Sequence, residues 1–274
     1  MTKTGLAHIK IILVEPAGAL NVGSVARVMK NMGLNQLVLV NPQCDRFSPD
    51  ARQMAVRAID VLEAAQTVAT LPEALRGCQR AIATTGRDRT ALSVNLEPAR
   101  STLPWLLETS PNHEVWPSAL IFGREDRGLT KEELNYAQRS IRIPSSDIYP
   151  SLNLAQAVAI CCYELYVAAA EAVPAEAEQP EAAGDRQPTP AFAPYFNPAV
   201  PLASLDALEG YYQQLEALLL NIGYLYPHTA PSRMEKLRRL YNRAYLSEAE
   251  VAMLRGILSQ MDWALHRLSK PEDS

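Results

Sequence analysis

The sequence is poor in the features that mark several common protein classes. It contains four cysteines, none of which forms a C-x-x-C pair, so neither a disulfide framework nor a structural zinc site is expected. No run of 18 apolar residues occurs, which predicts that nothing in the chain spans a membrane. The opening segment, MTKTGLAHIK, lacks the apolar core of a signal peptide. These absences predict a reduced, cytoplasmic protein that holds no metal ion.

Two common nucleotide-binding motifs are also missing. The stretch LVEPAGALNVGSVARVMKNMG overlaps the apolar run IKIILV, as a nucleotide-binding turn would. Its glycines Gly18 and Gly23 do not form G-x-G-x-x-G, however, and the G-K-[ST] of a P-loop occurs nowhere. A dinucleotide fold and a Rossmann-type methyltransferase are therefore disfavoured. The formal net charge of −4 argues mildly against a nucleic-acid partner, although a local basic face is enough to contact phosphates.

What is present is an alternation of short Val/Ile/Leu runs with helical patterns. The expected strands cover residues 8–15, 36–42, 79–85, 117–123 and 140–144. The expected helices cover 22–32 and 50–65, with a short helix capped by Thr70 and Glu73, one opened by the capping box Thr130/Glu133, and a long one that starts near Ser151. This alternation predicts an α/β fold with a mainly parallel sheet and helices on both faces.

The last third of the chain changes character. The helix after Ser151 is apolar almost all round, which predicts burial on several sides, in the core or against another subunit. Residues 173–201 hold seven prolines without periodicity and are expected to be a linker between a domain at 1–172 and a helical domain at 202–274. Helices are expected over 204–222, from Ser232 with a capping box to Glu235, and from Ser247 with a capping box to Glu250.

Three polar clusters follow expected strand ends, where open α/β sheets bind ligands. They are Asn21/Gly23/Ser24/Arg27, Gly123/Arg124/Glu125/Arg127 and Ser151/Asn153. Taken singly, each is explained by an ordinary helix cap or turn: Asn21 or Ser151 as a cap, Gly123 as a turn, Asn153 as a solvated side chain. Their order and strand contexts together favour a functional site.

In these three clusters the sequence resembles the SpoU branch of the SPOUT methyltransferases. The matching stretches are NVGSVAR, LIFGREDRGL and PSSDIYPSLNLAQA. ILVEPAGALNVGSVARVMKNMG, LVLVNP and TTGRDRT look closest to the TrmJ-type tRNA 2′-O-methyltransferases. One departure is Leu20, which stands where the family usually has glycine. The resemblance implies a C-terminal trefoil knot, a homodimer formed through the knot helices, and a helical tRNA-binding C-terminal domain.

The resemblance also implies S-adenosylmethionine as cofactor and assigns residues to the site. The cofactor would be held by Thr84, Thr85, Gly86, Gly123, Ile143, Pro150, Ser151 and Leu152. Catalysis would involve Arg27, with Asn21, Glu125, Ser151 and Asn153. Because a guanidinium hardly deprotonates, we expect Arg27 to grip a phosphate and stabilise the developing alkoxide rather than act as a base. Glu125 is expected to fix Arg27 or Arg124 or to act in the partner's site, or else to form a surface ion pair with Arg127.

RNA contacts are assigned to Arg27, Arg87, Arg89, Arg124, Arg238 and Arg239. The segment 233–243 carries five basic residues against one acid, and phosphate binding and a solvated helix face remain equally open interpretations. Tyr241 and Tyr245 are expected to stack on bases or to pack in a core. The predicted function is methylation of a ribose 2′-OH in tRNA, at nucleotide 32 of the anticodon loop. The alternatives are a SpoU-type enzyme acting on rRNA or another tRNA site, and a non-catalytic RNA-binding relative.

Overall fold

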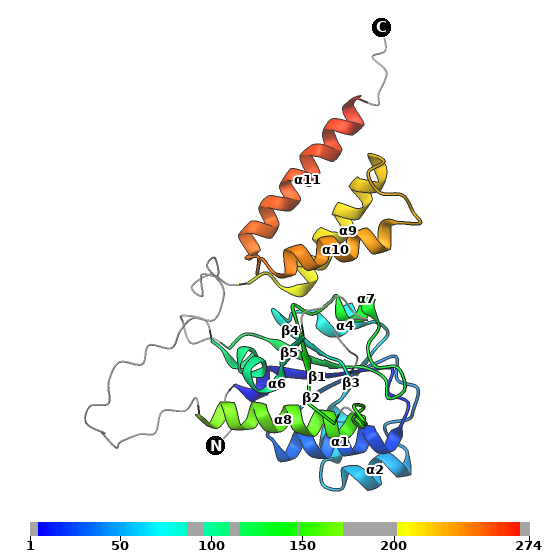
Figure 1. The fold of residues 1–274 in the computed structure, drawn as a ribbon, viewed down its shortest axis with the longest axis vertical. Helices are drawn as coiled ribbons and strands as arrows, with labels where there is room; N and C mark the ends of the chain where they lie inside the picture. The colour runs from blue at the N-terminus through cyan, green and yellow to red at the C-terminus, as the bar shows by residue number, and fades with distance from the viewer. Residues whose placement is uncertain (1–4, 87–95, 110–114, 147, 172–201, 269–274) are drawn as a thin grey trace, which may run out of the picture.

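The computed structural model describes residues 5–86, 96–109, 115–146, 148–171 and 202–268 (Figure 1). Its centre is a sheet of seven strands in the order β3-β2-β1-β6-β4-β7-β5, and every neighbouring pair is parallel. The strands are β1 (Ile9–Val14), β2 (Gln36–Val40), β3 (Gln66–Val68), β4 (Arg80–Thr84), β5 (Leu96–Pro98), β6 (Ser118–Phe122) and β7 (Arg139–Arg142). The central strands β1, β6 and β4 are mainly apolar and almost fully buried because both faces of the sheet are covered.

Helices cover the two faces of the sheet (Figure 1). One face carries α1 (Ala19–Asn31), α2 (Pro49–Ala55), α3 (Ile59–Ala64), α6 (Ala99–Thr102) and α8 (Leu154–Glu171). The other carries α4 (Leu71–Leu75), α7 (Lys131–Leu134) and the C-terminal helices α9 (Leu205–Asn221), α10 (Ala230–Asn242) and α11 (Glu248–Leu268). The 3₁₀ turns Leu6–His8 and Leu103–Leu107 complete the described elements. The α/β fold with helices on both faces is confirmed.

Several element boundaries differ from the expectations. The helix expected over 50–65 breaks into α2 and α3, because Val56 adopts a positive φ of 52°. Strands β3 and β5 were not predicted, because each is three residues long and β5 contains a proline. Helix α10 begins at Ala230 rather than Ser232, and its N-cap residue Thr229 makes no side-chain capping bond. The capping boxes at Thr130 and Ser247 are confirmed.

Helix α8 is long and apolar enough to cross a membrane by length and composition alone, although no membrane-spanning segment was expected from the sequence. In this chain its Val158, Cys161, Cys162 and Leu165 pack into the core against the sheet and α1. On its outer side Tyr163 is 51% exposed. The expected burial on several sides is therefore absent within the described residues of a single chain.

The C-terminal helices share a hydrophobic core with the sheet rather than forming a separate one. Leu205, Leu208 and Tyr211 belong to the same buried cluster as strand residues of β1, β2, β4 and β6. The segment that enters α9 is held at the turn between α4 and β4, where Leu205 N–H donates to the Cys78 carbonyl oxygen at 2.8 Å. Asn242 Nδ2, at the end of α10, donates to the Asn135 carbonyl oxygen at 3.1 Å.

Candidate active site at the carboxyl edge of the sheet

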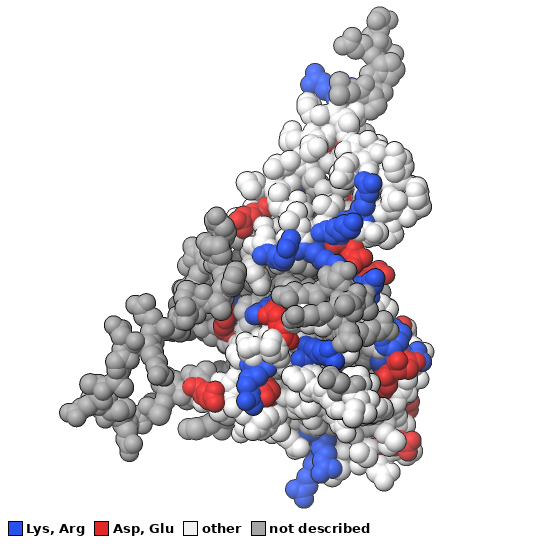
Figure 2. All heavy atoms as spheres, in the orientation of Figure 1, with Lys and Arg blue, Asp and Glu red and all other residues white. Residues whose placement is uncertain are grey.

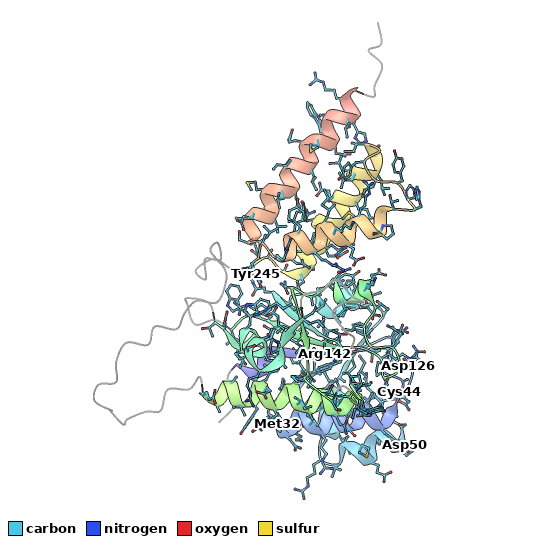
Figure 3. All side chains as sticks on the ribbon, in the orientation of Figure 1. Met32, Cys44, Asp50, Asp126, Arg142 and Tyr245 are labelled. Atoms are coloured by element: carbon cyan, nitrogen blue, oxygen red, sulfur yellow. The ribbon has the colours of Figure 1, made fainter. Side chains whose placement is uncertain are left out.

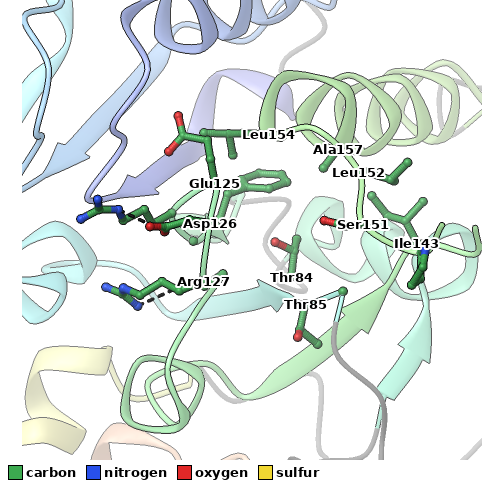
Figure 4. A pocket seen from close by; sticks show the side chains of 16 residues that line it. Thr84, Thr85, Glu125, Asp126, Arg127, Ile143, Ser151, Leu152, Leu154 and Ala157 are labelled. Carbon is green, nitrogen blue, oxygen red and sulfur yellow. Dashed lines mark hydrogen bonds and ion pairs between the residues drawn. The ribbon is translucent and has the colours of Figure 1, made fainter.

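A cavity of about 260 Å³ opens where β4, β6 and β7 end, at the carboxyl edge of the parallel sheet. All eight residues assigned above to cofactor binding line it: Thr84, Thr85, Gly86, Gly123, Ile143, Pro150, Ser151 and Leu152. Leu154 and Ala157 of α8 close one side (Figure 4). The lining therefore combines hydroxyl groups and backbone at strand ends with an apolar wall.

The loop after β6 owes its shape to two glycines. A Cβ on Gly123 would lie 2.1 Å from the Gly128 carbonyl carbon, and Gly128 adopts a positive φ of 65°. Arg127 ties this loop to the sheet, because it donates to Glu15 at 2.8 Å and to Glu133 at 3.1 Å. Both acids and their hydrogen bonds hold the pKa of Arg127 above its usual range, so its charge is fixed.

Glu125, in the same loop, caps the N-terminus of α1 from a distance. Its carboxylate accepts hydrogen bonds from the Ala17 and Gly18 N–H groups at 2.9 and 3.0 Å and from Asn21 Nδ2 at 3.0 Å. Gly18 is the N-cap residue and has no side chain of its own to do this. Burial opposes ionisation of Glu125, but these hydrogen bonds keep its pKa below its usual range.

The ion pairs considered for Glu125 are therefore wrong. Arg127 pairs with Glu15 and Glu133, and Arg124 pairs with Asp126 at 3.1 Å. Figure 4 shows the Glu125 carboxylate turned toward α1, away from Thr84 and Thr85. The negative charge instead complements the positive end of the α1 dipole.

Asn21 connects Glu125 to the start of α8. Its side-chain oxygen accepts a hydrogen bond from Asn153 Nδ2 at 3.0 Å, while its amide nitrogen donates to Glu125. Asn153 Oδ1 accepts from the Ala155 N–H at 2.9 Å and so caps α8. The alternative explanation of Ser151 as an ordinary N-cap is wrong, because α8 begins at Leu154, and Ser151 lines the cavity. One polar chain thus joins all three motifs.

Leu20 does not disturb this series of hydrogen-bonded side chains. It lies in the first turn of α1 with its side chain 51% exposed, and Asn21 still reaches both of its partners. Gly23, by contrast, is required, because a Cβ there would lie 2.1 Å from the Ala51 carbonyl oxygen of α2. The motif's glycine therefore serves helix packing, while its asparagine serves the site.

Arg27 lies on the exposed side of α1, outside the lining of the cavity. Within the described part of the chain its guanidinium has no ion pair or hydrogen bond. Its position is about 9 Å further along the helix axis than Asn21, at 1.5 Å per residue. The structure therefore leaves this cation available for an outside group.

The two C-terminal arginines assigned to RNA are turned inward. Arg238 pairs with Glu209, its side chain is 16% exposed, and its guanidinium lies 4.5 Å from the centre of the Tyr212 ring. Arg239 pairs with Glu235 and donates to Asn135 Oδ1 at 3.3 Å. Both hold the C-terminal helices in place, so the expectation that they face RNA is corrected. Arg87 and Arg89 lie outside the described residues.

The two C-terminal tyrosines also pack. The Tyr241 ring lies edge-on to Tyr211, with ring centroids 5.2 Å apart, and Tyr245 lies edge-on to Trp105 at 6.0 Å. Figure 3 labels Tyr245 beside the sheet, where the C-terminal helices meet it. Of the two interpretations, core packing is confirmed. No group of three or more His, Cys, Asp or Glu side chains among the described residues is arranged to hold a metal ion.

Comparison with known proteins identifies the family of the chain. Residues 8–163 match the model of the SpoU rRNA Methylase family, and residues 206–273 match that of the tRNA methyltransferase TrmJ C-terminal domain. The tRNA (cytidine/uridine/adenosine-2′-O-)-methyltransferase TrmJ of Pseudomonas aeruginosa is 40% identical over 96% of this chain and 97% of its own. The tRNA (cytidine/uridine-2′-O-)-methyltransferase TrmJ of Pectobacterium atrosepticum is 40% identical over 93% of this chain and 97% of its own.

Solved structures give the same answer. The crystal structure of TrmJ from Z. mobilis ZM4 superposes with a TM-score of 0.74 at 28% identity, covering 92% of this chain and 98% of that one. A probable methylase family protein from Haemophilus influenzae superposes with a TM-score of 0.57 at 30% identity, covering 97% and 100%. The chain therefore belongs to the SpoU methylase family and, within it, to the TrmJ-type methyltransferases.

Proposed function

We propose that this protein transfers a methyl group from S-adenosylmethionine to a ribose 2′-OH of tRNA in the cytoplasm, at nucleotide 32 of the anticodon loop. The observation that carries the proposal is one cavity at the carboxyl edge of the sheet, which two of the motifs line and to which Asn21 of the third is joined by hydrogen bonds. The Pseudomonas and Pectobacterium relatives are tRNA 2′-O-methyltransferases by name, which supports tRNA as the substrate.

The cavity lining fits such a cofactor. Ile143, Leu152 and Ala157 offer an apolar surface for an adenine ring, while Thr85 and Ser151 stand beside backbone groups that suit hydroxyl and carboxylate groups. A Cβ on Gly86 would meet no atom of the described residues within 4 Å, so among them this edge of the cavity is open space. When bound, S-adenosylmethionine supplies an electrophilic methyl group.

The residues of the chain then divide into two roles. Arg27 binds a phosphate next to the target ribose and stabilises the negative charge that develops on the 2′ oxygen. Ser151 orients groups at the mouth of the cavity. Asn21, Glu125 and Asn153 bond to one another, so they act by fixing the starts of α1 and α8. This arrangement aligns the reacting groups before the reaction, and such alignment lowers the entropic part of the activation barrier.

We further propose a homodimer in which Arg27 serves the partner's cavity. Arg27 does not line the cavity of its own chain, and the neighbouring outer side of α8 exposes Ile160, Tyr163 and Tyr166. An apolar helix face of this kind is typical of a subunit interface. The trefoil knot implied by the resemblance stays a prediction.

Subunit mixing tests this arrangement. Arg27→Ala removes the cation, and Gly86→Trp fills the cavity from a position where a side chain meets open space. Each variant alone should be inactive. In an equal mixture about half of the dimers are mixed, and each holds one intact site, so about a quarter of the wild-type activity should return. No recovery, with mixed dimers verified by mass, would place Arg27 in its own chain's site.

The function itself is tested by tritiated methyl transfer to two tRNA transcripts, one unmodified and one already 2′-O-methylated at position 32. Label that enters only the unmodified transcript supports both the reaction and its position. Equal labelling of both transcripts would support the methyl transfer but assign it to a nucleotide other than 32. Binding of tRNA without any labelling points to a non-catalytic RNA-binding protein.

A further inference from the structure

The loop between α9 and α10, residues 222–229, exposes a group of aromatic side chains. Tyr224 is 57% exposed and Tyr226 is 55% exposed. The rings of Tyr226 and His228 stack, with centroids 6.0 Å apart and planes 24° from parallel. Clustered aromatic side chains left in water are a common sign of a binding surface, because their burial against a partner is favourable.

The exposure of these rings does not come from a loose loop. Gly223 ends α9 with a positive φ of 74°, and Leu225 inserts into the core with 1% of its surface exposed. The Tyr226 carbonyl oxygen accepts hydrogen bonds from the N–H groups of Thr229 and Ala230, both at 2.8 Å. The rings are therefore presented by a fixed backbone, which lowers the entropy lost when a ligand is bound.

The outer face of α10 adds positive charge next to these rings. Arg233, Lys236 and Arg243 are exposed at spacings of three and seven residues, so they lie on one side of the helix over about 15 Å. Arg233 also lies over the Tyr224 ring, 5.5 Å from its centre. Among the described residues, no acid forms an ion pair with any of these three. Figure 2 shows Lys and Arg side chains gathered along α10.

We propose that loop 222–229 and the outer face of α10 form a binding site for unpaired RNA nucleotides, with bases stacked on Tyr224 and on the Tyr226/His228 pair. Arg233, Lys236 and Arg243 would bind the phosphates. The inference deepens the proposed function, because it takes RNA as the substrate of the same enzyme. Stacking on aromatic rings accepts any base but needs the base to be unpaired, as in a tRNA loop.

The site is distinct from the residues that the sequence suggested. Of the five cations in 233–243, Arg238 and Arg239 pair inward with Glu209 and Glu235, and the other three face outward. A duplex without loops would meet only the cations. The site therefore has two parts that separate experimentally, one aromatic and one electrostatic.

Two variants test the two parts with a matched control. Tyr224→Ala/Tyr226→Ala removes the rings, and Arg233→Ala/Lys236→Ala/Arg243→Ala removes the charges. The control removes three exposed cations from other faces of the chain: Arg57→Ala/Arg76→Ala/Arg255→Ala. Binding is measured for an unmodified tRNA transcript and for a blunt RNA duplex without unpaired nucleotides, at several salt concentrations. Thermal unfolding verifies that each variant is folded.

The ring variant should weaken tRNA binding by about 5- to 150-fold for each base that loses its stack, and leave duplex binding unchanged. The charge variant should weaken binding of both RNAs. For tRNA, the slope of log K against log salt should become shallower by about 2, because each of the three lost phosphate contacts accounts for about 0.7. The control should bind as the wild type does. In steady-state methylation, both test variants should raise KM for tRNA and keep kcat at saturating tRNA.

Unchanged tRNA binding by both folded variants would overturn the proposal, as would an equal loss of duplex binding in the ring variant. Failure of the proposed function looks different. In that case the wild-type protein itself transfers no methyl group to tRNA, whatever the variants bind. If the wild type methylates tRNA and the variants bind it equally well, the function stands and this site does not.

Discussion

Removing the Glu125 carboxylate should destabilise the chain well beyond what a surface acid would. The carboxylate accepts three hydrogen bonds at 2.9 to 3.0 Å, two from the start of α1 and one from Asn21. Hydrogen bonds to a charged group contribute about 1.5–3 kcal/mol each, and a lost helix cap costs about 1 kcal/mol. Because the carboxyl group is only half-buried, we expect Glu125→Ala to lower the free energy of unfolding by about 2–4 kcal/mol.

The neighbouring acid Asp126 provides the control. It lies in the same loop, its side chain is 65% exposed, and it pairs with Arg124. Asp126→Ala should therefore cost less than about 1 kcal/mol. Both variants are measured in the full chain by urea unfolding at pH 7, followed by tryptophan fluorescence. If Glu125→Ala costs no more than Asp126→Ala, then Glu125 does not cap α1 in the way described.

The pH dependence gives a second test of the same contact. Burial opposes ionisation, but the hydrogen bonds from Ala17, Asn21 and Gly18 lower the pKa of Glu125 below its ordinary value of 4.5. The unfolded chain therefore takes up this proton first as the pH falls. The stabilisation is full above about pH 4.5 and is lost as the pH falls through the lower pKa of the folded state. The stability difference between wild type and Glu125→Gln should accordingly shrink below that pH.

Three further outcomes are expected elsewhere in the molecule. Gly123→Ala brings a Cβ within 2.1 Å of Gly128, so calorimetric affinity for S-adenosylmethionine should fall about 10²-fold, and an unchanged affinity would contradict the tight loop. Asn242→Ala strands the buried Tyr212 hydroxyl and the Asn135 carbonyl, and urea unfolding should show a loss of about 2–3 kcal/mol that exposed Asn221→Ala does not share. A thiol reagent at pH 8 should modify the partly exposed Cys44 and leave the buried Cys162 intact. Burial raises the pKa of both thiols, that of Cys162 to about 12, and only Cys44 is accessible to the reagent; mass spectrometry counts the adducts.

The sequence predicted the position of those cavity-lining residues that lie at strand ends. Thr84 ends β4, and Gly123 and Ile143 directly follow β6 and β7. These strands are parallel neighbours, so a correct assignment of the strands brings the three residues to one edge of the sheet. The capping role of Glu125 was harder to predict, because its partners Ala17 and Gly18 offer only backbone N–H groups. No sequence pattern marks a backbone donor more than a hundred residues away.

The C-terminal helices show where sequence reasoning stops. The basic run 233–243 is visible as composition, but which cations face outward depends on the phase of α10 and on acids supplied by α9. The helix was expected to begin at Ser232, and that expectation did not predict which side of α10 faces outward. Tyr224 and Tyr226 were not predicted to be functional residues, because nothing in the sequence distinguishes an exposed tyrosine from the buried Tyr211 and Tyr212. The sequence signal that could have indicated their exposure is the pair of turn-forming residues on either side of them, Gly223 and Pro227.

The docking of α9 at the Cys78 turn also bears on how proteins of this kind evolve. The regions that match two separate family models, 8–163 and 206–273, share one apolar interior here. A C-terminal segment exchanged with that of a distant relative would have to match that interior as well as carry out its own function. Recombination at the proline-rich boundary should thus be rare, and the two regions should be inherited together. New RNA targets would then arise by substitutions on the outer faces of α9–α11, where the shared interior places no demand.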